Sequence, residues 1–207
     1  MNYLITLVLI ASSCFPYSNN SLPDAAKDKK FDEYWYNNEA EISSYTLSQA
    51  RYGELHQGTA VLIFVTEHHS PSSGTKPDNV GKNDIPILKL NFTKKFNTGI
   101  YPYSMMTSTF LPVSNGEHSL KISSSSQEWC GHTYMEMFNR KQFDIQISSY
   151  FEGESKKFKV KKNLLEDDLW TMIRLNPGDL PIGKLNVIPS FFALRLLHKP
   201  FKAYLCE

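Results

Sequence analysis

The sequence predicts a mainly β fold, in which a single antiparallel sheet curves towards a half-barrel and one helix from the C-terminal half packs on it. Apolar and polar residues alternate over positions 143–148, as in a strand with one buried face. Aromatic residues make up 13% of the chain and Gly and Pro are scattered, which is typical of a β-rich domain. Only residues 163–176 show a clear helical period. A chain of 207 residues fits one domain with a sizeable core.

The strands are predicted in order along the chain, separated by turn residues. A β-branched apolar run over residues 59–67 indicates the most buried strand, and residues 68–84 form a long polar loop. Turns are expected at residues 53–58, at Thr98-Gly99, at Asn115-Gly116 and at residues 139–141. The predicted strands cover residues 45–50, 59–67, 85–92, 101–110 and 117–126, then the two strands of the stretch 121–154, and finally 185–188, 191–198 and 201–205.

The predicted helix spans residues 163–176, NLLEDDLWTMIRLN. Leu165, Leu169 and Ile173 recur at helical spacing with Trp170 beside them, and this apolar stripe is expected to face the sheet. Three acidic residues, 166–168, fall where the helix dipole favours negative charge. Asn163 is the expected cap, and Pro177-Gly178 ends the helix.

The N-terminal segment resembles a bacterial lipoprotein signal peptide. The apolar run LITLVLIA is too short to span a bilayer and leads through two serines to Cys14. We expect a signal peptide over residues 1–13, acylation of Cys14, a flexible tether over 14–32 and one β-rich domain over 33–207. This predicts a lipid-anchored protein of the bacterial cell envelope, periplasmic or surface-facing, that meets the membrane through its acyl anchor. The alternative is an ordinary secretory signal cut nearby, with Cys14 incidental.

The charge balance argues against nucleic acid as a partner. The 22 basic and 21 acidic residues give a net charge of +1. A phosphate backbone is held by a field of Lys and Arg side chains, and this composition supplies none.

Glu128, Cys130 and His132 form the densest cluster of chemically versatile side chains. If a regular strand ran through them, all three would share one face, and Cys130 would be a nucleophile with His132 as its base. The alternative is a structural cysteine, free or bonded to Cys206. No known cysteine-enzyme signature surrounds Cys130. The chain also lacks a G-x-S-x-G elbow, a Walker loop and a G-x-G-x-x-G fingerprint.

Metals and cofactors are not expected. The histidines are scattered, and no H-x-x-x-H or C-x-x-C pair occurs. Glu152 and Glu154 flank Gly153 and have two interpretations, a hydrolytic carboxylate pair or a solvated strand end.

The leading functional hypothesis is a non-catalytic envelope protein that binds an apolar ligand or a partner protein on its concave sheet face. The aromatic residues expected to line that face, or to pack in the core, are Trp35, Tyr36, Tyr101, Tyr103 and Trp129. The alternative function is an envelope hydrolase or thiol enzyme centred on Glu128, Cys130 and His132.

Four segments together resemble a family of flavobacterial-type envelope lipoproteins whose function is not established: residues 33–67, SSSSQEWCGHTY, SYFEGE and EDDLWTMIRLNP. Members often carry the label septum formation inhibitor Maf. The Maf pyrophosphatases begin with S-x-S-P-R-R on an α/β fold, and this sequence has neither feature. The segments G-T-A-V-L and D-L-W-x-x-I-R are also similar to periplasmic β-domains thought to resemble lipoprotein-carrier folds, which is an analogy of fold alone.

Overall fold

The computed structural model describes residues 29–114 and 116–207, and its main feature is an eight-stranded antiparallel sheet. The strands lie in the sheet in chain order, and the sheet does not close on itself. The mainly β, open antiparallel architecture predicted from the sequence is therefore confirmed. Its strands are β1 (Glu41–Arg51), β2 (Glu54–His69), β3 (Ile85–Thr98), β4 (Tyr101–Pro112), β5 (Lys121–Glu128), β6 (Gly131–Asn139), β7 (Phe143–Ser149) and β8 (Lys156–Val160).

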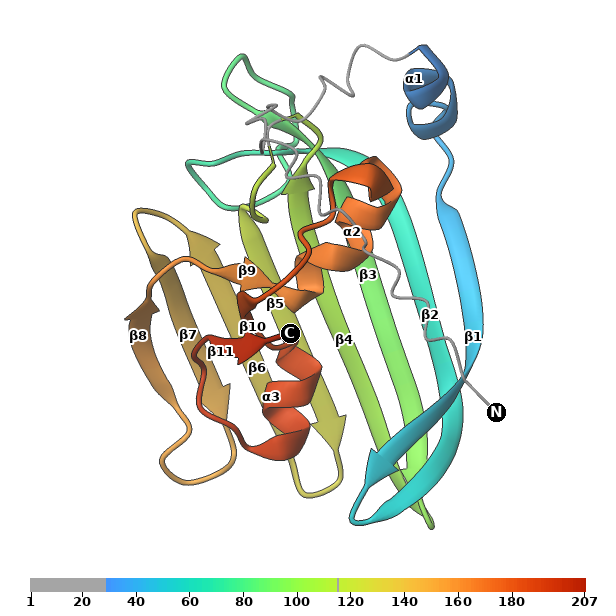
Figure 1. Ribbon diagram of the computed structural model, residues 1–207, viewed down its shortest axis with the longest axis vertical. Coiled ribbons are helices and arrows are strands. Elements are labelled where there is room, and N and C mark those ends of the chain that lie inside the picture. The colour runs from blue at the N-terminus through green and yellow to red at the C-terminus, as the bar shows by residue number, and fades with distance from the viewer. Residues whose placement is uncertain (1–28, 115) are drawn as a thin grey trace, which may run out of the picture.

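The helices lie on one face of this sheet. Figure 1 shows α2 (Glu166–Leu175) and α3 (Phe191–Leu197) in front of the strands, together with a small sheet of β9 (Leu164–Leu165), β10 (Leu185–Ile188) and β11 (Tyr204–Cys206). A short 3-10 helix, η2 (Pro177–Asp179), follows α2. Helix α1 (Lys29–Trp35) begins within the predicted tether and lies at one end of the molecule. None of the described helices is long and apolar enough to cross a membrane.

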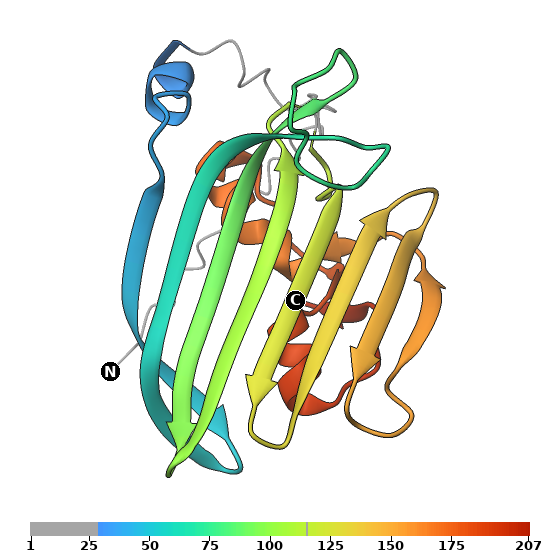
Figure 2. The ribbon, with the colours of Figure 1, turned by 180° about the vertical axis from the view of Figure 1, so that it is seen from behind.

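We call the opposite side of the large sheet the open face, because none of the helices within residues 29–114 and 116–207 covers it (Figure 2). The loop between β2 and β3 folds over one end of it. There the Lys121 ammonium donates a hydrogen bond to the Gly74 carbonyl at 3.3 Å. Gly74 also sits so close to the Phe138 ring that an added Cβ would lie 2.7 Å from it.

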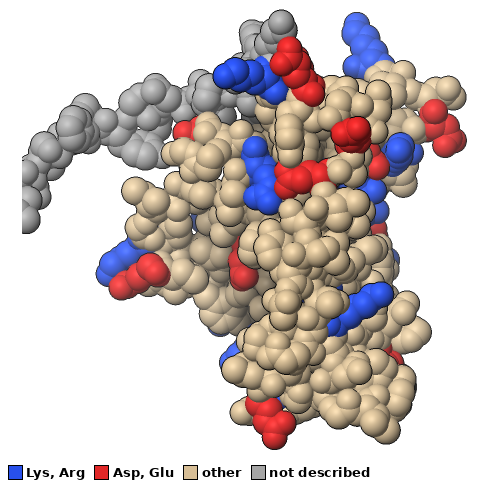
Figure 3. All heavy atoms as spheres, turned by 90° about the vertical axis from the view of Figure 1, so that its right-hand side faces the viewer, with Lys and Arg blue, Asp and Glu red and all other residues tan. Residues whose placement is uncertain are grey.

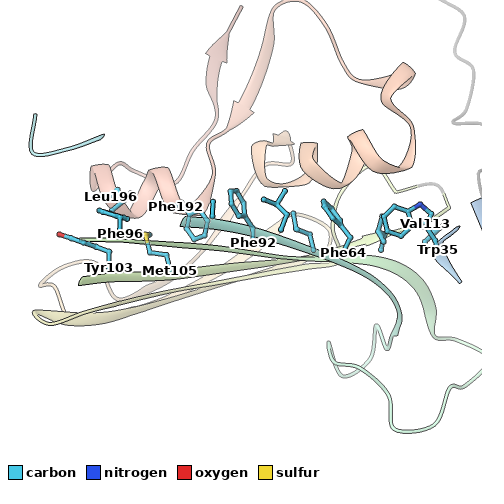
Figure 4. Close-up of a cluster of buried hydrophobic side chains, with 13 residues drawn as sticks. Trp35, Phe64, Phe92, Phe96, Tyr103, Met105, Val113, Phe192 and Leu196 are labelled. Carbon is cyan, nitrogen blue, oxygen red and sulfur yellow. The ribbon is translucent and has the colours of Figure 1, made fainter. Parts of the chain in front are cut away.

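Two hydrophobic clusters fill the space between the sheet and the helices. Figure 4 shows the first, in which Phe92 and Phe96 of β3 point towards Phe192 and Leu196 of α3. The second lies over β5 to β8 and contains the fully buried rings of Phe143 and Phe191. Each such ring adds roughly 1.5–3 kcal/mol to the stability of the fold.

A polar seam separates the two clusters along β4 and β5. Thr107 and Ser124 share a hydrogen bond of 2.8 Å between their hydroxyls, and Thr109 meets Thr171 of α2 at 3.4 Å. All four side chains are buried. The helix-covered face therefore has a hydrogen-bonded middle between two apolar halves.

The turns at Gly99 and at residues 140–142 agree with the sequence, but the turn expected over residues 53–58 is confined to Tyr52 and Gly53. Gly58 lies inside β2, opposite Phe96 of β3. A Cβ there would stand 2.2 Å from the Lys95 carbonyl oxygen, so the close approach of the two strands requires glycine. Asn115 of the predicted Asn115-Gly116 turn lies outside the described residues.

Helix α2 is present, but its predicted apolar face is only partly buried: Leu165 is buried just before the helix and the Trp170 ring packs on Phe92 with its centroid at 5.6 Å. Trp170 and Ile173 are 40% and 37% exposed, whereas Asp167, Asp168 and Thr171 are buried against the sheet and α3. The helix is also shorter than predicted, because Leu164 and Leu165 form β9 and Leu165 takes the cap position in place of Asn163.

The buried carboxylates of α2 are held by backbone donors. Asp168 accepts hydrogen bonds from the Ser119 backbone N–H at 3.0 Å and from the Ser119 hydroxyl at 2.5 Å. Asp167 accepts one from the Phe191 N–H at 2.9 Å, at the start of α3. These bonds explain why α2 turns acidic residues inward, since each one satisfies a donor that would otherwise be buried without a partner.

Residues 191–198 were predicted as a strand, and this is wrong: they form α3 and its C-cap. Ser190 caps the helix by accepting a hydrogen bond from the Ala193 N–H. His198 ends it in the left-handed region at φ 48°. A short apolar run such as FFALRLL has no period that separates a buried strand from a buried helix. The last strand is β11, at residues 204–206 instead of 201–205.

Candidate functional site

The strand expected to carry Glu128, Cys130 and His132 together is broken, so the face they were predicted to share does not exist. Strand β5 ends at Glu128 and β6 begins at Gly131, with Trp129 and Cys130 as the two-residue turn between them. A reversal of chain direction at that point places Glu128 on the helix-covered face and His132 on the open face, next to Gln127. No hydrogen bond joins the three side chains among the described residues.

Cys130 and Cys206 are free and exposed, so the pairing considered for them is absent here. The Cys130 backbone N–H donates to the Tyr101 hydroxyl at 2.8 Å. Partial burial, with contributions from Cys130 and Glu128, raises the pKa of Tyr101 to about 12. Tyr101 therefore keeps its proton at neutral pH and donates it to Glu128 at 3.3 Å.

Glu128 takes part in a buried ion pair with α3. The Arg195 Nη2 donates to Glu128 Oε1 at 2.6 Å, and the two side chains are only 3% and 5% exposed. Ser126 also donates to this carboxylate, at 3.3 Å. Arg195 stacks over the Phe151 ring at 4.5 Å. The structure thus places Glu128 in a structural anchor for α3.

The polar network continues from Arg195 towards the surface. Arg195 Nη1 lies 3.3 Å from His198 Nε2, and His198 Nδ1 lies 2.7 Å from Glu154 Oε1. Ser149 donates to the other Glu154 oxygen at 2.6 Å. Burial alone would raise the pKa of Glu154, but the bonds from Ser149 and His198 outweigh it and hold that pKa below its usual value. Glu154 is therefore ionised at neutral pH and ties the β7–β8 connection to the end of α3.

A pocket of about 200 Å³ opens beside this network, on the helix-covered side of β6 to β8, and we call it the α3 pocket. Its apolar wall is formed by Met135, Ile147, Leu194, Pro200 and Phe201. Its polar wall is formed by Thr133, Glu154, Lys156, Arg195, His198 and Lys199, in which three fixed cations face one carboxylate. The Nε of Arg195 is buried and has no hydrogen-bond partner within the part of the chain that the structure describes.

The five aromatic residues singled out from the sequence fall into two groups. Tyr101 lies between Tyr103 and Trp129, with ring centroids 5.2 and 5.6 Å away. Tyr103 is buried in the first hydrophobic cluster, while Trp129 is 66% exposed. Trp35 and Tyr36 are at the other end, on and after α1, where Trp35 packs in the core and Tyr36 is exposed. They do not form one continuous aromatic surface.

Sequence reasoning missed Arg195, His198 and most of the α3 pocket. Glu154 was noticed only as one of two carboxylates at a strand end. Arg195 and His198 lie in the segment that was predicted as a strand, and Arg195 is 67 positions from Glu128. No local pattern reveals so distant a pairing. The remaining signal was the charged Arg195 within an otherwise apolar run, which in a buried segment requires a partner.

No group of three or more metal-ligating side chains occurs within residues 29–114 and 116–207.

Comparisons with known proteins supply no relative: no family model, no curated protein and no solved structure matches the chain. The resemblance to envelope lipoproteins therefore stays a prediction.

Proposed function

We propose that the protein is a non-catalytic, lipid-anchored protein of the bacterial cell envelope that binds a small amphiphilic anion in the α3 pocket. One observation carries the proposal: the pocket combines an apolar wall with Arg195, a buried cation whose Nε has no partner among the described residues. Ligand sites are typically such concavities, apolar for the most part, with a few polar groups that fix the ligand's orientation.

The size and charge of the pocket define the ligand class. At about 200 Å³ it is smaller than the roughly 300–1,000 Å³ of sites for drug-sized molecules. Arg195 is already paired with Glu128, which leaves Lys156 and Lys199 against the single carboxylate of Glu154, so an anionic head group is still favoured over a cationic one. Met135, Ile147 and Phe201 would cover an apolar body. A short-chain or aryl carboxylic acid fits this description.

The proposal for the pocket predicts that hexanoate binds at least about tenfold more tightly than hexan-1-ol, because a charge-assisted hydrogen bond is about twice as strong as a neutral one. Ligand-observed NMR titration of the full chain measures both affinities. Ile147→Trp is expected to abolish hexanoate binding because the larger side chain fills the pocket. Lys199→Glu is expected to weaken it because a carboxylate replaces a cation of the pocket.

The matched control is Ile100→Trp, the same change at a position that is 83% exposed in the β3–β4 turn. It is expected to bind hexanoate like the wild type. Lys199 is exposed, so Lys199→Glu tests the pocket even where Ile147→Trp disturbs the fold. Equal affinity for hexanoate and hexan-1-ol, or unchanged binding in both pocket variants, would contradict the proposal.

Lipid anchoring at Cys14 is supported by the sequence alone, since Cys14 lies outside the described residues. Metabolic labelling with a fatty-acid analogue is expected to mark the wild type and to leave Cys14→Ala unmarked. Equal labelling of the two proteins would remove the anchor. An unlabelled wild type cut near residue 14 would point to the ordinary secretory signal.

The charges on the side with the β1 edge are mixed in sign, which gives no support there for binding nucleic acid (Figure 3). On the side with the β1 edge, basic and acidic residues stand next to one another, mostly near the end with α1, above a largely uncharged surface (Figure 3). Such a mixed surface gives no continuous positive field along which a phosphate backbone would lie.

A further inference from the structure

The open face carries a second concavity, separate from the α3 pocket and on the other side of the sheet. It has a volume of about 560 Å³ and lies over β5, β6 and β7 near their ends at the β5–β6 turn. We call it the open-face groove. Its lining residues are Ser125, Ser126, Gln127, His132, Thr133, Tyr134, Ser148, Ser149, Tyr150 and Ser155. Ser126, Thr133 and Ser149 form one row across the strands, and their side chains lie on the helix-covered face, where Ser126 donates to Glu128 and Ser149 to Glu154. The alternate positions Ser125, Gln127, His132, Tyr134 and Ser148 project from the open face. Figure 2 shows this region of the sheet free of any helix.

The composition of the open-face groove is unusual for this chain, because none of its ten lining residues is Asp, Glu, Lys or Arg. The side chains that project from the open face carry hydroxyl groups, one amide and one imidazole. A lysine-rich surface lies on the same side of the sheet at the opposite ends of β6 and β7, where Arg140, Lys141, Lys159, Lys161 and Lys162 line a concavity with Asp144. The lining of the groove is therefore uncharged, while the other end of the same strands is basic.

Several polar side chains in the groove have unused hydrogen-bonding capacity. Ser125 and Ser148 flank Tyr134 across the β5, β6 and β7 ladders, and Gln127 lies opposite His132 in the next row. Among the described residues, no hydrogen bond is formed by the side chains of Ser125, Gln127, His132 or Ser148. A strand spacing of about 4.8 Å places these donors and acceptors in a regular array on one surface.

Two tyrosine rings stand in the same groove. Tyr134 is 42% exposed and its hydroxyl donates to Glu136 at 3.1 Å. Tyr150 is 72% exposed, and its Cβ lies so close to Gly131 that an added Cβ there would be 2.6 Å away. Gly131 thus provides the space in which Tyr150 lies against the start of β6. Exposed tyrosines offer rigid apolar area together with a polar tip.

We propose that the open-face groove is a binding site for a neutral oligosaccharide. A sugar presents hydroxyls that both donate and accept, and apolar C–H faces that pack on aromatic rings. The free hydroxyl, amide and imidazole groups match the first requirement, and Tyr134 and Tyr150 match the second. A charged polymer would leave its charges without counterparts here, and a protein partner would need an apolar centre that the groove lacks. The inference does not depend on the ligand of the α3 pocket.

The test is a titration of the full chain with chitotetraose and cellotetraose, two neutral probes, and with tetragalacturonate as an anionic one, by ligand-observed NMR and calorimetry. At least one neutral probe is expected to bind. Tyr134→Ala and Tyr150→Ala are each expected to weaken that binding about fivefold to tenfold, and Gln127→Ala to weaken it with little effect on the fold. Ile147→Trp, in the α3 pocket, should bind the probe like the wild type.

Tyr45→Ala is the matched control, because Tyr45 is 51% exposed on β1, at the far edge of the sheet. It should leave the affinity unchanged. Absence of binding by both neutral probes at millimolar concentration would overturn the proposal. It would equally be overturned if only tetragalacturonate bound, in a salt-sensitive way, or if the groove variants matched Tyr45→Ala.

Discussion

Glu128→Leu is expected to lower the free energy of unfolding by about 3–5 kcal/mol, because it leaves the guanidinium of Arg195 buried without its counter-ion. Arg195 is only 3% exposed in its side chain and already has an unpaired Nε. His198, at 3.3 Å, is its only other hydrogen-bond partner within the described chain. Urea unfolding followed by circular dichroism measures the change.

The pair itself, by contrast, is expected to be replaceable. The double variant Glu128→Leu/Arg195→Met removes both charges, and its free energy of unfolding should come within about 1–2 kcal/mol of the wild type. The loss of stability in the double variant should then be much smaller than the sum of the losses in the two single variants, which means a large coupling energy between the two positions. If the loss of stability in the double variant equalled the sum of the two single losses, the two side chains would not depend on each other as a buried pair.

Lys184 and Glu207 provide a control with nearly the same N–O distance in which both side chains are largely exposed. Their N–O distance is 2.7 Å, against 2.6 Å for Arg195 and Glu128, while their side chains are 73% and 68% exposed. Lys184→Met is expected to change the free energy of unfolding by no more than about 1 kcal/mol. The comparison isolates burial as the source of the effect, because distance is held almost constant.

Strand order and the antiparallel sheet were predictable because the relevant signals are local. Alternation over Phe143 to Ile147 and the turn after Asn139 together define β7 and its pairing with β6. Short polar connections between successive strands favour antiparallel neighbours, and a meander in chain order follows. The position of the strand ends was less predictable, since polar residues such as Asn97 continue the ladder of β3 beyond its apolar core.

The break at Trp129 and Cys130 shows where local alternation misleads. Nothing in the pattern distinguishes a strand that runs through Glu128 and His132 from two strands that turn between them. The difference decides whether the candidate site exists. The two-residue turn places Glu128 and His132 on different strands and on different faces of the sheet, whereas a continuous strand would place them on one face. Gly131, the first residue of β6, was the available signal for a turn at this point.

The faces of α2 and α3 were unpredictable for a tertiary reason. An apolar stripe normally faces the core, yet α2 exposes Trp170 and buries Asp168. The Ser119 N–H that donates to Asp168 lies 49 residues away. The helix sequence alone therefore cannot show that a buried acceptor is required. The α3 pocket was hidden for the same reason, since its cation and its apolar wall come from segments far apart in the chain.

The two buried aspartates of α2 should make stability depend on pH in an unusual direction. Burial raises the pKa of Asp167 to about 7 and that of Asp168 to about 6, partly offset by hydrogen bonds from Phe191 and Ser119. In the unfolded chain both groups titrate near pH 3.9. Between about pH 4 and 7 the folded state therefore binds more protons than the unfolded state. Their contribution to stability is complete below about pH 4 and is lost as the pH rises through 6 to 7.

Asp167→Asn/Asp168→Asn is expected to remove this dependence while keeping an acceptor for the N–H groups of Phe191 and Ser119. Relative to the wild type, the double variant should gain at least roughly 2 kcal/mol in free energy of unfolding between pH 4.5 and 7.5. Urea unfolding at four pH values across that window gives the difference. Asp78→Asn, an exposed change, is the control and should leave the pH profile parallel to that of the wild type.

Asp168→Ala separates the charge from the hydrogen bonds. It removes the buried charge as Asn does, but it leaves the Ser119 N–H without an acceptor, which costs about 1–3 kcal/mol at every pH. The alanine variant should therefore be less stable than Asp168→Asn by a nearly constant amount at every pH, although neither variant has a titrating carboxyl group at position 168. If Asp168→Asn and Asp168→Ala were equally stable, the bonds to Ser119 would not anchor α2. If the double asparagine variant kept the pH profile of the wild type, the two aspartates would not be its source.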